Sequence, residues 1–328
     1  MAKRFNILCL SGGGYLGLYT IAVLADLEKA SGKPIAHSFD LMAGTSIGGI
    51  IALGLAAEVP VARMQTVFEK DGPKIFSKTP APQSKFAVLR DLSRSLFSAK
   101  YKSELLRKTI AKLIGKNTTI GDLKHRVIVP SVNLTKGQPQ VFKTPHLEAY
   151  KKDLKLNAVD VALATSAAPT YFPVAEIGNS LFADGGLYAN SPDLLAIHEA
   201  TYFLKNKEDT IHLLSIGTTT SQFSFSHALG KNLGSYEWMS EQRLVNVMIS
   251  SQQLSVDYMT KHRLGDRYLR LDATQSKEQE RYLALDVATD DAKKTILGLA
   301  SATSQAYASN PILLDFLRYS APKPTLYK

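Results

Sequence analysis

The stretch Gly44-Thr45-Ser46-Ile47-Gly48 joins the apolar run 41–43 to a helix-like apolar run. A serine between two glycines at a strand-to-helix turn is typical of a nucleophile elbow. Small neighbours there permit a strained backbone, and the hydroxyl is exposed at the helix N-terminus. The same pattern also occurs in ordinary tight turns. It makes Ser46 the candidate nucleophile, with Gly44 and Gly48 supporting the motif.

A second glycine turn, Gly12-Gly13-Gly14-Tyr15-Leu16-Gly17, follows the apolar run 5–10. Its three successive glycines would let bare backbone N–H groups approach a substrate oxygen. We therefore expect Gly12, Gly13 and Gly14 to form an oxyanion hole, with Gly17 supporting the motif.

This second turn also fits the G-x-G-x-x-G fingerprint of dinucleotide-binding oxidoreductases. That fold expects an acidic residue at the end of the second strand, where it holds the ribose. Asp40 is the nearest candidate, but it begins the run 41–43 instead of ending it. The oxidoreductase stays open as an alternative function with a poorly placed ribose contact.

A third glycine turn lies far downstream, where the strand-like run 180–183 ends in Asp184-Gly185-Gly186. Asp-Gly is also common turn chemistry. A carboxylate that lies close to a serine and is partly desolvated can take the proton of the hydroxyl. Asp184 is thus the candidate general base, with Gly185 and Gly186 supporting its turn.

The order of these three turns resembles that of the patatin-like phospholipases, from about Phe5 to about Gly217. The stretches 101–106 and 164–173 add softer similarity. The resemblance implies a Ser–Asp dyad of Ser46 and Asp184 in a three-layer α/β sandwich with a mainly parallel central sheet. It also implies that the Gly12–Gly14 backbone forms the oxyanion hole.

The first glycine loop departs from the family pattern D-G-G-G-x-[RK]-G at two positions. Ser11 stands in place of the acid and Leu16 in place of the basic residue. Backbone donors do not depend on these side chains, so the expected oxyanion hole survives. Electrostatic help or a phosphate contact from the basic group is put in doubt.

A Ser-His-Asp triad on an α/β-hydrolase sheet is a further alternative, and it needs a histidine after the acid. The histidines that follow Asp184 are His198, His212, His227 and His262. His212 lies inside the apolar run 211–216, and none of the others is next to a glycine turn.

The composition, 45% hydrophobic and 21% charged over 328 residues, suits a folded enzyme with a large core. The single cysteine, Cys9, excludes an intrachain disulfide. No Cys/His cluster suggests zinc and no carboxylate spacing suggests calcium, so we expect neither a metal nor a cofactor.

The net charge of +10 suits contact with an anionic membrane surface. No helix-turn-helix, zinc or aromatic-stacking motif accompanies this charge, so we do not expect binding to a DNA or RNA duplex. No signal peptide is recognisable, and no apolar run approaches the roughly 20 residues that span a bilayer. We therefore expect a cytoplasmic protein that is peripheral at the inner membrane when active.

Strand-like and helix-like runs alternate up to Gly217, which indicates a parallel α/β sheet with its site at the carboxyl ends of the strands. We expect a catalytic domain at 1–217 and a helical C-terminal extension at 218–328 that packs on it. Helical patterns near 235–259 and 292–316 fit this extension, and self-association is a further use of the first. The basic segment 72–100 lacks periodicity, which fits a lid and equally an ordinary surface excursion.

These observations predict a serine lipid acyl hydrolase of phospholipase A type that acts on membrane phospholipid. An unrestrained enzyme of this kind would attack the membrane of its own cell, so we expect an activator. Chains of this size with extra C-terminal helices resemble the phospholipase effectors of bacterial anti-phage defence, which implies activation by a cyclic oligonucleotide. No motif identifies where such a ligand would bind.

Overall fold

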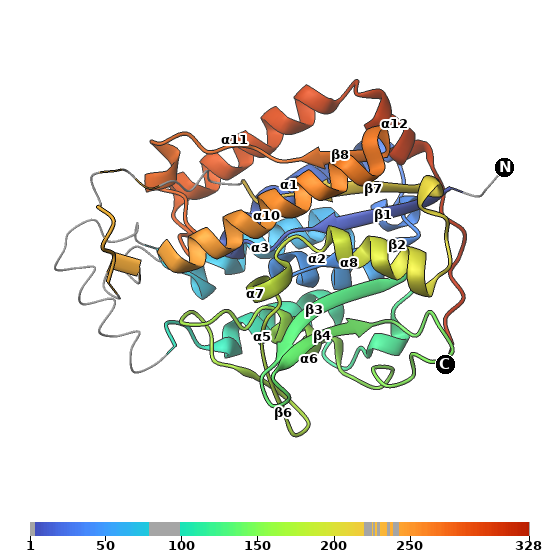
Figure 1. Ribbon diagram of the computed structural model, residues 1–328, viewed down its shortest axis with the longest axis horizontal. Coiled ribbons are helices and arrows are strands. Elements are labelled where there is room, and N and C mark those ends of the chain that lie inside the picture. Colours follow the sequence, from blue (N-terminus) through green and yellow to red (C-terminus); the bar gives the residue numbers. More distant parts are fainter. Residues whose placement is uncertain are drawn as a thin grey trace.

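The computed structural model describes residues 4–78, 99–219, 225, 227, 230–234, 237–238 and 243–327. Strands in these ranges form one eight-stranded sheet in the order β5-β6-β3-β2-β1-β7-β8, with β4 also paired to β3 (Figure 1). The strands are β1 (Phe5–Leu10), β2 (Leu41–Gly44), β3 (Val127–Asn133), β4 (Gln138–Lys143), β5 (Ala175–Ile177), β6 (Ser180–Asp184), β7 (Ile211–Ile216) and β8 (Tyr268–Leu271).

The centre of the sheet is parallel and one side of it is antiparallel. Strand β1 pairs in parallel with both β2 and β7, β2 pairs in parallel with β3, and β7 with β8. The pairs of β3 with β4, β3 with β6 and β5 with β6 are antiparallel. This arrangement confirms the predicted α/β sandwich with a mainly parallel central sheet.

Helices cover both faces of the sheet. On one face lie α1 (Gly17–Ser31), α2 (Ile47–Ala56) and α3 (Val61–Ile75), with α5 (Ser103–Ile114) and α6 (Ala158–Thr165) beside them. The other face packs against α8 (Asp193–His198) and α10 (Arg243–Leu264), and the short α7 (Gly186–Ala189) contacts α10 (Figure 1).

The alternation of side chains along β1 explains its continuous apolar sequence. Leu8 and Leu10 belong to the larger core, under α1 and α2. Ile7 and Cys9 point the other way, into a smaller core with side chains of α8. A parallel strand with both faces covered needs apolar residues on both sides, so it shows no polar alternation.

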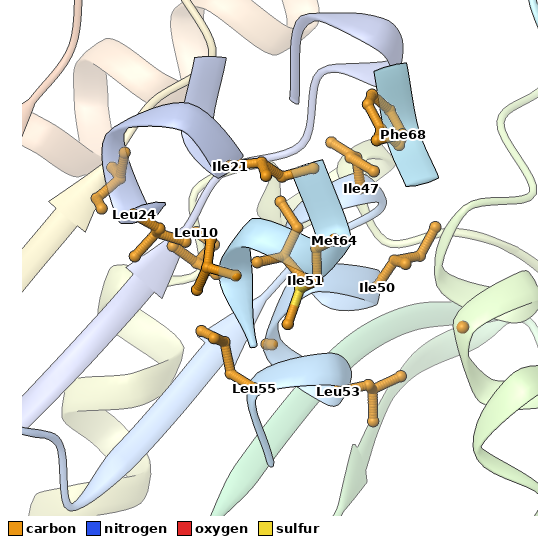
Figure 2. Close-up of a cluster of buried hydrophobic side chains, with 14 of the residues drawn as sticks. Leu10, Ile21, Leu24, Ile47, Ile50, Ile51, Leu53, Leu55, Met64 and Phe68 are labelled. Atoms are coloured by element: carbon orange, nitrogen blue, oxygen red, sulfur yellow. The ribbon is translucent and has the colours of Figure 1, made fainter. Parts of the chain in front are cut away.

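Helix α2, which begins directly after Ser46, is the most enclosed element near the expected site. All ten of its residues are buried. Figure 2 shows Ile47, Ile50 and Ile51 of this helix packed among side chains of β1, α1 and α3. Its N-terminus, and with it the serine turn, is therefore held firmly by the core.

The region after 217 contributes to the sheet as well as to the helical layers. Strand β8 extends the sheet beside β7, and α11 (Asp290–Tyr307) packs on α1, followed by α12 (Pro311–Arg318). The sequence-based reading found the helices but missed β8, because Arg270 interrupts its short apolar run. This partly buried arginine donates to Asp272 at 2.7 Å and to the Ser215 hydroxyl at 3.0 Å.

The expected irregular segment 72–100 begins later than the sequence indicates. Helix α3 continues through Pro73 to Ile75, and most of the remainder of the expected lid, residues 79–98, lies outside the described residues. Among the helices that are described, none combines the length and apolarity needed to cross a membrane.

Candidate active site

The ends of β2 and β6 meet head to head, and this brings Ser46 and Asp184 together. Both strands pair with the edge of β3 that lies opposite β4: Ala43 of β2 pairs with Ile128, and Asp184 of β6 pairs with Ser131. Strands β2 and β6 run in opposite directions, so each strand ends at the gap between them. The antiparallel strand β6 thus delivers its carboxylate to the carboxyl edge of the parallel strands.

Ser46 has the backbone conformation of a nucleophile elbow. Its φ of 55° and ψ of −124° lie in a region that non-glycine residues rarely adopt, and α2 begins at the next residue. The turn is closed tightly by its glycines. A Cβ on Gly44 would lie 2.1 Å from the carbonyl oxygen of Gly48, and a Cβ on Gly48 would lie 2.3 Å from that of Leu10. The G-x-S-x-G spacing is therefore a steric requirement of this turn.

The serine hydroxyl pairs directly with the aspartate. Ser46 Oγ donates to Asp184 Oδ2 at 2.7 Å, and the Gly186 N–H donates to Oδ1 of the same carboxylate at 2.7 Å. Burial raises the pKa of Asp184 to about 6, while these two hydrogen bonds act to lower it. Such a carboxylate remains mostly ionised at neutral pH, yet it is a stronger base than an exposed aspartate.

Thr165, at the end of α6, holds the backbone of Ser46 by a hydrogen bond. Sequence reasoning assigned this threonine no role. Its Oγ1 accepts from the Ser46 N–H at 3.0 Å and donates to the Pro130 carbonyl at 2.6 Å. Its own carbonyl accepts from the N–H of Gly185 at 3.3 Å. One residue thus links the serine turn, β3 and the aspartate turn. The signal was the small-residue stretch 164–173, which marked the region but not the residue.

The first glycine loop packs against the turn that follows Asp184. The Gly12 N–H donates to the Asn190 carbonyl at 3.0 Å, and the Gly12 carbonyl accepts from the side chains of Asn190 and Thr218, at 3.3 and 2.9 Å. The built Cβ position of Gly12 lies 3.2 Å from Ser46 Cβ, so this loop borders the serine. Gly14 adopts a φ of +56°, which favours glycine.

The three glycine amides differ in their hydrogen bonding. That of Gly12 is engaged by Asn190. Within the described part of the chain, no protein group accepts from the amides of Gly13 and Gly14. These two N–H groups are therefore the ones in this loop that are left for a ligand oxygen.

The histidines that a triad would need lie elsewhere. His212 is the second residue of β7, at the opposite end of the sheet from Ser46, and its ring contacts Phe316 of α12. Burial and the nearby Arg4 lower the pKa of His212 to about 4. The side chains of His198, His227 and His262 are exposed. Because Ser46 donates straight to a carboxylate, the triad alternative is not supported.

The dinucleotide alternative is not supported either. Asp40 precedes β2, at the amino end of the strand, and its Oδ2 accepts from the Asn6 N–H and the Tyr319 hydroxyl, both at 2.8 Å. This carboxylate joins the start of the sheet to the segment after α12, far from the glycine loop at the carboxyl ends.

Comparisons with known proteins identify the family of this chain. Two proteins named cGAMP-activated phospholipase are similar to this chain. The one from Pseudomonas aeruginosa is 43% identical, over 84% of this chain and 80% of its own length. The one from Vibrio cholerae serotype O1 is 38% identical, over 83% and 82%. Among solved structures, the type III effector protein ExoU aligns at 14% identity with a TM-score of 0.42, over 97% of this chain and 54% of that chain. The profile of the patatin-like phospholipases matches residues 8–197, and the chain belongs to this family.

Proposed function

We propose that this protein is a phospholipid acyl hydrolase in which Ser46 is the nucleophile and Asp184 the general base. The 2.7 Å hydrogen bond from Ser46 Oγ to the buried carboxylate carries this proposal. As Oγ attacks the ester carbonyl, its proton passes to Asp184 Oδ2 and a tetrahedral intermediate forms. Collapse of the intermediate breaks the ester bond, and the leaving alcohol takes the proton from Asp184. Water, deprotonated by the same carboxylate, then releases the fatty acid from the serine.

We propose an oxyanion hole with two backbone donors, where the sequence predicts three. We assign it to the amides of Gly13 and Gly14, because the amide of Gly12 already donates to Asn190. Two preorganised N–H donors suffice for such a hole, which stabilises the charge that develops on the carbonyl oxygen. Gly12 instead fixes the position of the loop through its own three hydrogen bonds.

A cyclic dinucleotide is the activator we propose. The support is the name shared by the relatives, cGAMP-activated phospholipase, at 37–43% identity over more than four-fifths of this chain. The need for an activator also has a physical reason, because a phospholipase that is always active would hydrolyse its own cell's membrane. Activation requires that the ligand binds the active conformation more tightly than the inactive one.

Activation is tested with the purified full chain and vesicles of anionic phospholipid. Fatty-acid release is measured without ligand, with cGAMP, and with cyclic di-GMP and cyclic di-AMP as matched controls. We expect cGAMP to raise the rate at least about tenfold, which corresponds to about 1.4 kcal/mol of differential binding. The Ser46→Ala protein should release none with any ligand. Equal rates with and without all three nucleotides would remove the activator while leaving the hydrolase intact.

Peripheral contact with the membrane is our second proposal beyond the family assignment. Helix α10 lies beside the turn after Asp184, since Gln252 donates to the Leu187 carbonyl at 3.0 Å. Elsewhere this helix exposes large apolar side chains. They are Leu244, Met248, Leu254, Tyr258 and Met259. Together with the net charge of +10, this face supports binding at an anionic membrane surface next to the serine.

A second copy of the chain could instead cover the same helix. Sedimentation with anionic vesicles and size-exclusion chromatography separate the two uses of the surface. Replacing Leu254 and Tyr258 by serine should weaken vesicle binding if α10 contacts lipid. A shift from dimer to monomer, with vesicle binding unchanged, would assign the face to self-association.

A further inference from the structure

Three ionisable side chains from distant parts of the sequence gather at the amino end of the sheet. His37 lies in the short helical turn Ile35–Ser38, Glu58 follows α2, and His125 precedes β3. His37 Nε2 is 3.2 Å from Glu58 Oε1, and His125 Nε2 is 3.4 Å from the same oxygen. The three potential ligand atoms all lie within 4.8 Å of one another.

This cluster is separate from the proposed catalytic site. Ser46 precedes the first residue of α2, and Glu58 lies just beyond its last. A ten-residue helix is about 15 Å long. A group bound at the cluster would therefore not touch a substrate at Ser46.

The segments that carry the three side chains are fixed to one another by hydrogen bonds from backbone N–H groups. Glu28 of α1 accepts from the N–H of Ile35 at 3.1 Å and from that of Val61 at 2.9 Å, so it ties the turn of His37 to the turn of Glu58. The N–H of Lys124, next to His125, donates to the Ala56 carbonyl at 2.7 Å. The cluster is thus held in place by the fold.

Glu58 adopts a backbone conformation that glycine would adopt more easily. Its φ is 59°, its N–H donates to Leu55 and that of Val59 donates to Gly54. These two bonds form the Schellman motif that ends many helices, and the left-handed position in that motif is usually glycine. A glutamate there costs about 1 kcal/mol of backbone strain. It also places a carboxylate between two imidazoles.

We propose that His37, Glu58 and His125 bind a divalent transition metal, with Zn²⁺ as the best fit. Two imidazoles and a carboxylate are ligands that zinc takes, and bond lengths of about 2.0–2.1 Å in a tetrahedron place neighbouring ligand atoms about 3.3 Å apart. The two measured separations, 3.2 and 3.4 Å, lie on either side of that value. The side chains of His37 and Glu58 are 44% and 45% exposed, so a water molecule can fill the fourth position.

The proposed ion would be structural. It would join the turn before β2, the end of α2 and the loop before β3, three segments that are far apart in sequence, and so stabilise the folded chain. Sequence patterns do not reveal this cluster, because its side chains are 21 and 67 residues apart and fit no local metal motif. The earlier expectation of no metal came from spacing alone.

The test uses the full chain, stripped with EDTA and dialysed, and titrated with ZnCl₂. Bound zinc is counted by elemental analysis, and affinity and Tm are followed by calorimetry. We expect one zinc per chain with a dissociation constant in the micromolar range or tighter, and a Tm that rises with zinc concentration. His37→Gln should weaken binding by more than the roughly 10–100-fold that loss of an outer-shell partner costs.

Two variants keep the test falsifiable. Glu58→Asn removes the ligand but keeps a residue that tolerates the left-handed conformation, so its fold is preserved and its zinc-dependent Tm shift should vanish. His262→Gln is the matched control, because among the described residues this exposed histidine pairs with Tyr258 of its own helix, through the carbonyl and the ring. Zinc binding that is absent from the wild-type chain, or that is equal in all four proteins, would overturn the proposal and leave a cluster of ordinary ion pairs.

Discussion

A non-glycine residue with positive φ stands at each end of helix α2, in opposite chemical settings. Ser46 at its start has a φ of 55° and Glu58 just past its end has a φ of 59°, although neither is glycine. At the first end the carboxylate partner, Asp184, is 5% exposed, and burial raises its pKa to about 6. At the second end the carboxylate is about half exposed, and hydrogen bonding by His37 lowers its pKa. A positive φ therefore marks both ends, and the surroundings of the two carboxylates fit the roles that we propose, a base at the first end and a metal ligand at the second.

Ser46→Ala should have the largest effect and should act at one end only. Loss of a nucleophile typically costs 10⁴-fold or more, so we expect phospholipid turnover to fall by at least about that factor. The Tm should change little and the zinc-dependent Tm shift should persist. A folded variant that keeps more than about a hundredth of wild-type turnover would show that another group is the nucleophile.

Asp184→Asn should be almost as inactive, because an amide cannot take the proton of the serine. In the wild-type enzyme, kcat/KM should fall as the pH drops below about 6, where Asp184 becomes protonated. Four control variants should each keep wild-type turnover: His198→Gln, His212→Gln, His227→Gln and His262→Gln. A folded histidine variant as inactive as Ser46→Ala would replace the dyad by a triad.

Asp184→Asn should also change how stability depends on pH. The folded-state pKa of Asp184, about 6, lies above the ordinary value of 3.8, so the native state binds more protons between these values. Wild-type stability from this group is therefore present below about pH 4 and is lost as the pH rises through 6, by at most about 3 kcal/mol. Relative to wild type, the variant should gain free energy of unfolding from pH 4 to pH 7, measured by urea denaturation. A constant difference across this range would contradict the burial argument.

Thr165→Val should have an intermediate effect, because it removes the acceptor for the Ser46 N–H and a donor to the Pro130 carbonyl. Each unsatisfied buried group costs about 1–3 kcal/mol, so we expect a lower Tm and about tenfold lower turnover. Thr165→Ser, which keeps the hydroxyl, is the control and should restore most of both. Equal losses in the two variants would assign the effect to packing of the methyl group instead.

Glu58→Gly should have the smallest effect. Glycine relieves the strain at the end of α2, worth about 1 kcal/mol, and the exposed contacts it removes contribute about 0–1 kcal/mol. The Tm of the zinc-free protein should therefore stay the same or rise slightly, and turnover should not change. A fall in turnover comparable to that of Thr165→Val would couple the two ends of α2, against the separation proposed here.

The sequence predicted one end of α2 much better than the other. The turn around Ser46 is a local motif, because its backbone can close only with glycine at positions 44 and 48. A steric requirement of this kind can be recognised in a short stretch of sequence. The pairing of Ser46 with Asp184 was predicted from a family resemblance. Its physical cause is the antiparallel direction of β6, which the sequence does not reveal. Engagement of the Gly12 amide by Asn190 and the cluster around Glu58 depend on contacts between remote segments. No local sequence pattern predicts these two features.

Labelling by a fluorophosphonate tests the identity of the nucleophile most directly, because the probe forms a covalent bond with an activated serine oxygen. The wild-type chain is treated with the probe, digested, and examined by mass spectrometry. We predict one adduct, on the peptide that contains Ser46, slower labelling in Asp184→Asn and none in Ser46→Ala. An adduct on a different residue, or undiminished labelling of Ser46→Ala, would contradict the assignment of Ser46 and Asp184 as the catalytic pair.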